Sequence, residues 1–225
     1  MSRLLVLRPE PAAAATVARA TAAGWHVIAA PLFTIVAEPW EAPDPAAHDA
    51  LMLTSAQAVR HAGDALHLYR GLPVYAVGEA TGVAATEAGF ADVRMGSADS
   101  ALLVTMMVRD GIAHPLHLAG REHRILDAAP IPIARRIVYA ADPVAALPPA
   151  ARAAVEQGAV ALLHSQRASA VFADLLGRAR IDPRGVRVAA ISGAAAAGPW
   201  SIVKIADTPT DSALLAAAAR LCEKG

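Results

Sequence analysis

Short apolar runs recur along the whole chain and alternate with Ala- and Leu-rich segments of helical length. Most of these runs are too short and too uniformly apolar for half-exposed antiparallel strands, which would alternate apolar and polar residues. Ten runs are expected to be strands: Leu4–Leu7, His26–Ala29, Leu51–Leu53, Val74–Val77, Ala91–Met95, Leu116–Leu118, Ile137–Tyr139, Val160–Leu163, Val188–Ile191 and Ile202–Ile205. Their alternation with helices predicts βαβ units, and therefore an α/β fold with buried parallel sheets.

The second half of the chain repeats short segments of the first half in the same order. Asp99–Leu103 recurs unchanged as Asp211–Leu215, an offset of 211 − 99 = 112. Three weaker pairs lie at nearly the same offset: Leu4–Val6 with Leu116–Leu118, Leu51–Ser55 with Ala161–Ser165, and Tyr75–Gly78 with Ala189–Ser192. One such match would mean little in a chain rich in Ala and Leu, but a constant order and offset indicate an internal duplication.

Two proline-rich, acidic segments without periodicity, Glu38–Pro45 and Asp142–Pro149, interrupt this pattern. Such composition is typical of linkers, and the roughly 100 residues between them suffice for a small domain. The chain is expected to begin one domain, build a second and return to complete the first: residues 1–36 with 146–225, residues 46–138, and linkers at 37–45 and 139–145. Each domain is predicted to hold a parallel sheet of about five strands flanked by helices.

Charge and cysteine content exclude several classes of protein. Lys and Arg total 20, Asp and Glu total 20, and the formal net charge is +0, so the overall positive field typical of nucleic-acid binding is absent. The single cysteine, Cys222, excludes an internal disulfide and a multi-cysteine zinc site. No apolar run approaches the ~18 residues of a membrane helix, and the first residues do not resemble a signal peptide. We therefore expect a cytoplasmic protein without nucleic-acid or membrane partners.

Candidate chemistry lies in the turns that follow the strands. In open parallel sheets, ligands bind beyond the carboxyl ends of the strands, where helix starts offer unpaired backbone N–H groups. These turns contain Arg8, Ser55, Gly78, Thr81, Gly120, Ser165, Ser192 and Gly193. For any one turn, N-capping of the following helix is enough to explain a hydroxyl or glycine residue. Taken together, such turns on two facing domains favour a site that binds several carboxylates.

Competing motifs are incomplete. The sequence has no phosphate-binding loop and no dinucleotide fingerprint, and Ser165 lacks the glycines of a nucleophile elbow. No carboxylate or cysteine pattern completes a metal site around His114, His117 and His123. The tryptophans share no spacing, and packing is the expected role of Trp25, Trp40 and Trp200.

The ordered set of turns resembles the uroporphyrinogen-III synthase family over essentially the whole chain. The matching elements are Leu5–Pro9, Gly24 with Pro31 and Leu32, Leu53–Val59, Val74–Thr81 with Gly89 and Phe90, Gly120 and Arg124, Val138 and Tyr139, Leu163–Ser165, Val188–Ser192 and Thr208–Thr210. The turn at Val77–Thr81 is the most specific of these elements.

The resemblance implies a lyase that cyclises hydroxymethylbilane to uroporphyrinogen III in tetrapyrrole biosynthesis, with loss of water and inversion of the last pyrrole ring. It implies two α/β domains joined by a two-stranded connector, a substrate cleft between them, and neither a metal nor an organic cofactor. A monomer is expected, and delivery of the substrate by the preceding pathway enzyme stays open.

The resemblance also assigns site residues. Ser55, Thr81 and Tyr139 match family positions implicated in substrate handling, and Tyr139 is the candidate to assist departure of the hydroxyl as a general acid or by holding a water. Packing beside the linker is an equal alternative for Tyr139. The expected substrate-binding set is Arg8, Ser55, Gly78, Thr81, Gly120, Arg124, Ser165, Ser192 and Gly193.

One departure from the family pattern leaves alternatives open. The turn at Ser192–Ala195 lacks the usual threonine pair, and the counterpart of Thr81 is Ala195, since 195 − 114 = 81. Backbone N–H groups are expected to remain available there at a helix start, with Ser192 as a partial substitute. The alternatives are a noncatalytic two-domain binding protein for a small acidic ligand and an inactive relative of the synthase.

Overall fold

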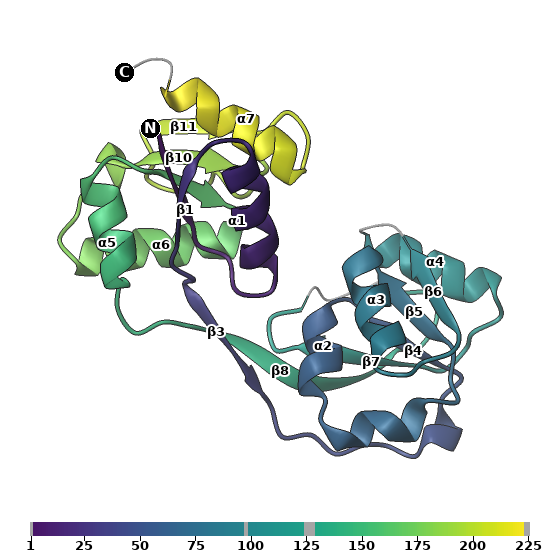
Figure 1. The fold of residues 1–225 in the computed structure, drawn as a ribbon. Coiled ribbons are helices and arrows are strands. Elements are labelled where there is room, and N and C mark those ends of the chain that lie inside the picture. The colour runs from purple at the N-terminus through teal and green to yellow at the C-terminus, as the bar shows by residue number, and fades with distance from the viewer. Residues whose placement is uncertain (1, 97–98, 124–128, 223–225) are drawn as a thin grey trace. The chain divides into compact units, whose positions relative to one another are not determined.

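The computed structural model describes residues 2–96, 99–123 and 129–222 of the chain (Figure 1). The chain divides into two compact units. Unit 1 comprises Met1–Thr34 and Pro143–Gly225, and unit 2 comprises Ile35–Asp142. Among the described residues, no helix is long and apolar enough to cross a membrane.

Unit 1 holds a five-stranded sheet in the order β11-β10-β9-β1-β2, and all its pairings are parallel. The strands are β1 (Arg3–Val6), β2 (His26–Ala29), β9 (Val160–Leu163), β10 (Arg187–Ala190) and β11 (Ile202–Ile205). The helices are α1 (Ala12–Ala22), α5 (Pro149–Glu156), α6 (Gln166–Arg178) and α7 (Asp211–Cys222), with a 3-10 turn at Pro183–Gly185. Leu4 and Val6 pack with α1 and α7 in one core cluster.

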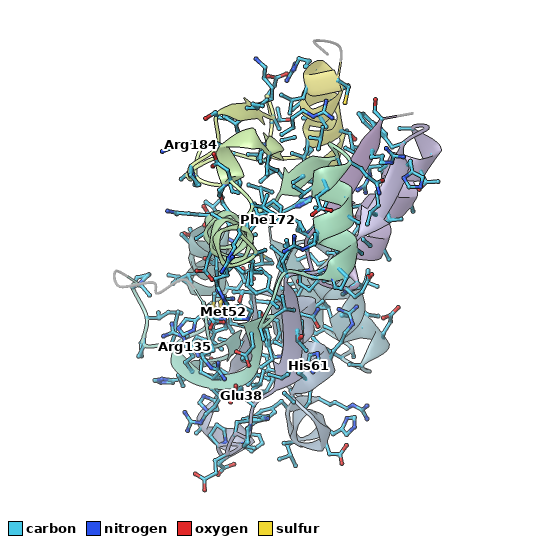
Figure 2. The ribbon with its side chains drawn as sticks, turned by 90° about the vertical axis from the view of Figure 1, so that its left-hand side faces the viewer. Glu38, Met52, His61, Arg135, Phe172 and Arg184 are labelled. Atoms are coloured by element: carbon cyan, nitrogen blue, oxygen red, sulfur yellow. The ribbon has the colours of Figure 1, made fainter. Side chains whose placement is uncertain are left out.

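Unit 2 holds a six-stranded sheet in the order β3-β8-β7-β4-β5-β6, apart from the first two residues of β3 and the last residue of β8, which fall in unit 1. The strands are β3 (Phe33–Ala37), β4 (Ala50–Leu53), β5 (Val74–Val77), β6 (Val93–Gly96), β7 (Pro115–Gly120) and β8 (Ala134–Pro143). The helices are α2 (Ala56–His61), α3 (Glu79–Glu87) and α4 (Ser100–Arg109), with 3-10 helices at Pro45–Ala47 and Asp64–Tyr69. Alternate residues of β4 enter different cores: Leu51 packs with α2 and α3, whereas the fully buried Met52 packs with α4. Met52 is labelled in Figure 2.

The predicted α/β fold with two helix-flanked sheets is confirmed, with one correction in unit 2. Strand β3 extends that sheet to six strands, and it runs antiparallel to β8. The Glu38 N–H donates to the Val138 carbonyl, and the Val144 N–H donates to the Leu32 carbonyl. The residue number on the β8 side thus rises from 138 to 144 as the number on the β3 side falls from 38 to 32, which is the pattern of an antiparallel pair. Residues 37 and 139–143, predicted within linkers, lie in these two strands.

A second correction concerns the turn at Ser192–Ala195, which was expected to begin a helix. It forms a short turn in which the Ala196 N–H donates to the Ser192 carbonyl at 3.0 Å. Only 201 − 190 = 11 residues join β10 to β11, close to the minimum for any parallel crossover. Gly198 and Pro199 then end the turn before further helical residues can follow.

Trp200 packs the segment between β10 and β11 against the core, which is the packing role predicted for this residue. Its indole N–H donates to Ser169 Oγ at 2.8 Å, and Ser169 Oγ in turn donates to the Ala197 carbonyl at 2.8 Å. Its ring stacks on Phe172 with centroids 5.7 Å apart.

Replacing Trp200 with alanine should lower the free energy of unfolding by about 3–5 kcal/mol, because the change leaves a cavity beside Phe172 and removes a buried hydrogen bond. Urea unfolding followed by circular dichroism measures the effect. Ile205→Ala, at a side chain that is 45% exposed, is the control and should cost less than about 1 kcal/mol. Equal losses for the two variants would contradict the assigned anchoring role.

Candidate functional site

The carboxyl edge of the unit 2 sheet carries a pocket of about 270 Å³. It lies where β4, β5 and β7 lead into their following turns, beside Tyr139 in the middle of β8, as expected for an open parallel sheet. Its lining residues are Thr54, Ser55, Val77, Ser100, Gly120, Glu122, His123 and Tyr139. The structure therefore brings together three of the predicted site residues, Ser55, Gly120 and Tyr139, around one cavity.

The ring of Tyr139 lies directly over Gly120. The two residues are register partners in β7 and β8, next to an irregularity of the ladder between Ala119 and Gly120. A Cβ built on Gly120 would lie 2.6 Å from Tyr139 Cζ and 2.8 Å from its hydroxyl oxygen. Any side chain at position 120 would displace the tyrosine ring, and glycine therefore permits this close approach. On its other side, Tyr139 is tilted against His61, with ring centroids 6.4 Å apart.

Two helix starts flank this pocket. Ser55 caps α2, and its Oγ accepts from the Gln57 N–H at 3.2 Å, which leaves the hydroxyl proton available to a ligand. Gly78 caps α3 with φ 73°, a conformation that favours glycine. Thr81 lies in the first turn of α3, is only 5% exposed, and is outside the set that lines the pocket.

A buried histidine, rejected above as a metal ligand, is hydrogen-bonded to Thr54. His117 on β7 is 2% exposed, and its Nε2 lies 3.0 Å from Thr54 Oγ1. Arg135 Nε donates to His117 Nδ1 at 3.4 Å. Burial, with the nearby Arg135 and His123, lowers the pKa of His117 to about 3. The ring is therefore neutral near pH 7.

His123 also lines the pocket. Its Nδ1 lies 2.8 Å from the Gly120 carbonyl oxygen, which can only accept, so Nδ1 carries the proton. His117 and His123 meet edge to face with centroids 6.1 Å apart. No group of three or more His, Cys, Asp or Glu side chains within residues 2–96, 99–123 and 129–222 is arranged to hold a metal ion.

The carboxyl edge of the unit 1 sheet carries a polar cluster around Asp211, the first residue of α7. Asp211 accepts from Thr16 Oγ1 at 2.8 Å and from Arg8 at 3.4 Å, pairs with Arg19, and lies 3.3 Å from His164 Nε2. The contact with His164, the Thr16 hydroxyl and the charge of Arg8 hold the pKa of Asp211 well below its usual range. Arg8, predicted to bind substrate, thus already has an internal carboxylate partner.

The remaining predicted residues belong to unit 1 or lie outside the described residues. Ser165 caps α6 and accepts from the Ala168 N–H at 3.1 Å. Ser192 Oγ accepts from the Ala195 N–H at 3.3 Å, and the neighbouring Gly193 is exposed. Arg124 lies outside the described residues. Sequence reasoning missed Thr54, His117 and Asp211 as site residues, although Asp211 opens the verbatim repeat of Asp99–Leu103.

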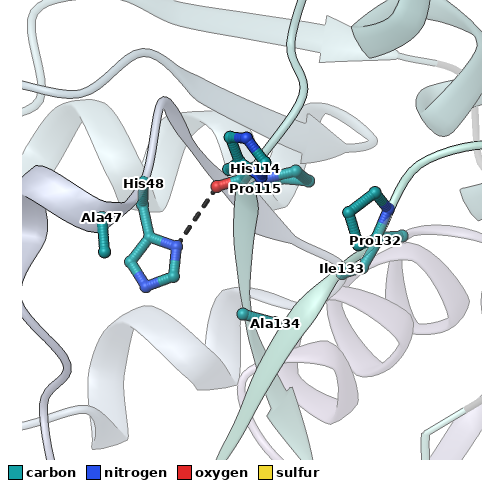
Figure 3. Close-up of a pocket in the computed structure, with 7 residues that line it drawn as sticks. All are labelled: Ala47, His48, His114, Pro115, Pro132, Ile133 and Ala134. Atoms are coloured by element: carbon teal, nitrogen blue, oxygen red, sulfur yellow. Dashed lines mark hydrogen bonds between the residues drawn. The ribbon is translucent and has the colours of Figure 1, made fainter.

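A second cavity lies at the opposite edge of the unit 2 sheet (Figure 3). Its volume is about 310 Å³, and its lining is largely apolar. The lining residues are Ala47, His48, His114, Pro115, Pro132, Ile133 and Ala134. His48 Nδ1 lies 3.2 Å from the His114 carbonyl. No predicted site residue lines this cavity, so the carboxyl edge is the better candidate.

Comparison with known proteins supports the fold described above. A family model described as uroporphyrinogen-III synthase HemD matches residues 14–216. A crystal structure of a mutant uroporphyrinogen III synthase from the extremely thermophilic bacterium Thermus thermophilus matches with 17% identity and a TM-score of 0.56, covering 100% of both chains. Another, of the wild-type protein from the same bacterium, has 17% identity and a TM-score of 0.45, covering 100% of this chain and 99% of that one. Among curated proteins, none matches the chain significantly.

Gly120→Ala should move the Tyr139 ring and lower the free energy of unfolding by about 1–3 kcal/mol, because the added methyl overlaps the ring. Thermal unfolding measures the loss, and Gly71→Ala, which has open space around it, is the matched control. In a Tyr139→Ala background the same substitution should cost much less. An undiminished cost in that background would show that the ring is not what excludes a side chain at position 120.

His117 should make stability depend on pH. Its pKa is about 3 in the folded chain against 6.5 ordinarily, so the unfolded chain binds the extra proton between these values, and stability falls as pH decreases through that window. Between pH 7 and about pH 5 the loss should reach about 2 kcal/mol.

Urea unfolding at the two pH values measures this dependence. His117→Gln, which cannot titrate, should show a loss smaller by that amount. If the variant and the parent lose stability equally on acidification, His117 is not buried in its neutral form.

Proposed function

The chain belongs to the uroporphyrinogen-III synthase family, and we propose that it cyclises hydroxymethylbilane to uroporphyrinogen III, with loss of water and inversion of the last pyrrole ring. We place this step in the cytoplasm, within tetrapyrrole biosynthesis. The observation that carries the proposal is the pocket in which Tyr139, held over Gly120, shares one cavity with Ser55. Family membership supplies the reaction, and the pocket supplies groups suited to it.

The reaction asks more for orientation than for strong acid or base chemistry. Loss of the hydroxyl gives a resonance-stabilised azafulvenium cation, and the free bilane closes unaided to the type I ring. To form the type III ring, the substituted carbon of the last pyrrole must attack, giving a spiro intermediate that reopens and closes with that ring inverted. Holding the chain in the attacking geometry is therefore the main catalytic contribution.

Tyr139 is proposed to assist the first step. Its hydroxyl lies at the pocket, close to Gly120, so it can protonate the departing hydroxyl directly or through a water. Glu122 also lines the pocket, and its negative charge favours the cation that forms.

The many carboxylates of the substrate need donors on a chain whose formal net charge is +0. We propose that hydroxyl and backbone N–H groups at the carboxyl edges of both sheets supply them, through Ser55, Gly78 and Thr81 in unit 2 and through Arg8, Ser165, Ser192 and Gly193 in unit 1. Helix starts favour carboxylates through their unpaired N–H groups and partial positive charge.

The helix-free turn at Ser192–Ala195 favours one alternative, an inactive relative that binds the bilane without directing its closure. The deciding experiment incubates the purified protein with hydroxymethylbilane, oxidises the products and separates the porphyrin isomers. The type III isomer should predominate, whereas a reaction without protein gives type I. Type I as the only product would refute the proposed activity.

Tyr139→Phe should lower kcat by roughly 100-fold, since general acid assistance contributes on this order. Thr81→Ala should also slow turnover, by a smaller factor, because it loosens the start of α3. The control is Cys222→Ser, at a residue far along α7 from its starting Asp211, which should leave the initial rate unchanged. Equal rates for all three variants would show that neither Tyr139 nor Thr81 belongs to the site.

A further inference from the structure

We propose that His117 is a positioning residue that fixes the Thr54 hydroxyl as a hydrogen-bond donor to an oxygen of the substrate in the pocket beside Tyr139. The identity of the substrate rests on the function proposed above. The orientation of Thr54 rests only on the hydrogen bonds of unit 2.

Arg135 determines which nitrogen of His117 carries the proton. A guanidinium has donors and no acceptor, so the 3.4 Å contact from Arg135 Nε requires an unprotonated Nδ1 on His117. The ring is buried and lies beside Arg135 and His123, which disfavours a second proton. The single proton is therefore on Nε2.

That proton determines the direction of the Thr54 hydroxyl. His117 Nε2 lies 3.0 Å from Thr54 Oγ1 and must donate to it. A threonine hydroxyl otherwise rotates between donor and acceptor roles, but here its oxygen already accepts on the buried side. Its own proton is left for a partner on the other side, and Thr54 lines the pocket with Tyr139. An oxygen of the substrate, which accepts hydrogen bonds, is the complementary partner.

The duplicated half of the chain shows that the fold does not require this histidine. At the repeat offset, position 117 corresponds to Leu5, since 117 − 112 = 5, and Leu5 is fully buried in β1. Position 54 corresponds to His164, since 164 − 110 = 54. Unit 1 therefore builds the same strand arrangement with an apolar residue, whereas unit 2 buries a polar ring, which costs free energy unless it is hydrogen-bonded.

Two variants at position 117 separate the donor from the bulk of the side chain. His117→Leu copies the residue used in unit 1 and removes the donor, whereas the amide nitrogen of His117→Gln can still donate to Thr54. Loss of one hydrogen bond corresponds to about fivefold to tenfold. We expect kcat/KM to fall by that factor in the Leu variant and by less than about threefold in the Gln variant.

A double-mutant cycle with Thr54→Val tests whether His117 acts through Thr54. In the Thr54→Val background, His117→Leu should change kcat/KM by less than about twofold. A fall in kcat alone places the recognised oxygen on the hydroxymethyl group, and a rise in KM alone places it on a carboxylate. Equal losses with and without Thr54, or no loss in the Leu variant, would overturn the proposal.

Nitrogen-15 NMR of the histidine rings tests the orientation independently of turnover. At about pH 7, His117 should show an unprotonated Nδ1 and a protonated Nε2, unchanged on acidification to about pH 5. The opposite tautomer, or titration near the ordinary histidine pKa, would overturn the assignment even in an active enzyme. If no type III product forms, the proposed function fails. The His117 and Thr54 variants are then compared by their Kd for uroporphyrin III, and the same double-mutant cycle tests the proposal through binding.

Discussion

Close contact between Gly120 and the Tyr139 ring is the interaction on which the unit 2 site depends. The ring occupies the space that a Cβ on Gly120 would fill, and it does so where the parallel ladder between β7 and β8 becomes irregular. The contact holds the tyrosine hydroxyl at the carboxyl edge, beside the turns that follow β4 and β5. The contact with His61 holds the ring from another element, so that its position relative to Ser55 and Thr54 is defined.

The two halves of the duplicated chain use their carboxyl edges differently. In unit 2 the edge keeps a pocket lined by hydroxyl groups, and its buried histidine is tied to Thr54. In unit 1 the corresponding edge is filled by its own carboxylate, since Asp211 pairs with Arg8 and Arg19 and lies beside His164. A substrate carboxylate that binds Arg8 must therefore compete with Asp211. Unit 2 is accordingly the better placed of the two to supply reactive groups, with unit 1 contributing mainly through backbone donors.

Much of the fold follows from local sequence pattern. Short Val- and Leu-rich runs between Ala-rich helices predicted ten of the strands, because central parallel strands are buried on both faces and carry little polar alternation. Strand β3 was missed: only Phe33 of its five residues is buried, and the strand lies next to the proline-rich segment Glu38–Pro45, which was interpreted as a linker. A helix start was expected after β10 because this turn is the counterpart of the turn at Gly78–Thr81, but the short span to β11 and the Gly198-Pro199 pair prevent a helix.

The part of the candidate site that lies in turns after strands could be predicted from the sequence. The part that lies inside strands or depends on distant residues could not. Ser55 follows β4 and Gly120 ends β7, and parallel pairing brings these strand ends together. Tyr139 was also expected at a strand end, but it lies inside the longer strand β8 and reaches the pocket as the register partner of Gly120. His117 lies inside β7, and its relation to Thr54 depends on the neighbouring strand and on a proton fixed by Arg135 from β8. Asp211 is 203 residues from Arg8, so only the folded chain shows that they pair.

The proposed function depends on substrate binding at the carboxyl edge of the unit 2 sheet. Backbone amide NMR during titration with uroporphyrin III, the oxidised form of the proposed product, tests it most directly. We expect the shifts to concentrate at residues 54–55, 78–81 and 120–123, while residues 47–48 and 114–115 at the opposite cavity stay unchanged. Shifts confined to the residues around His48 and His114 would contradict it.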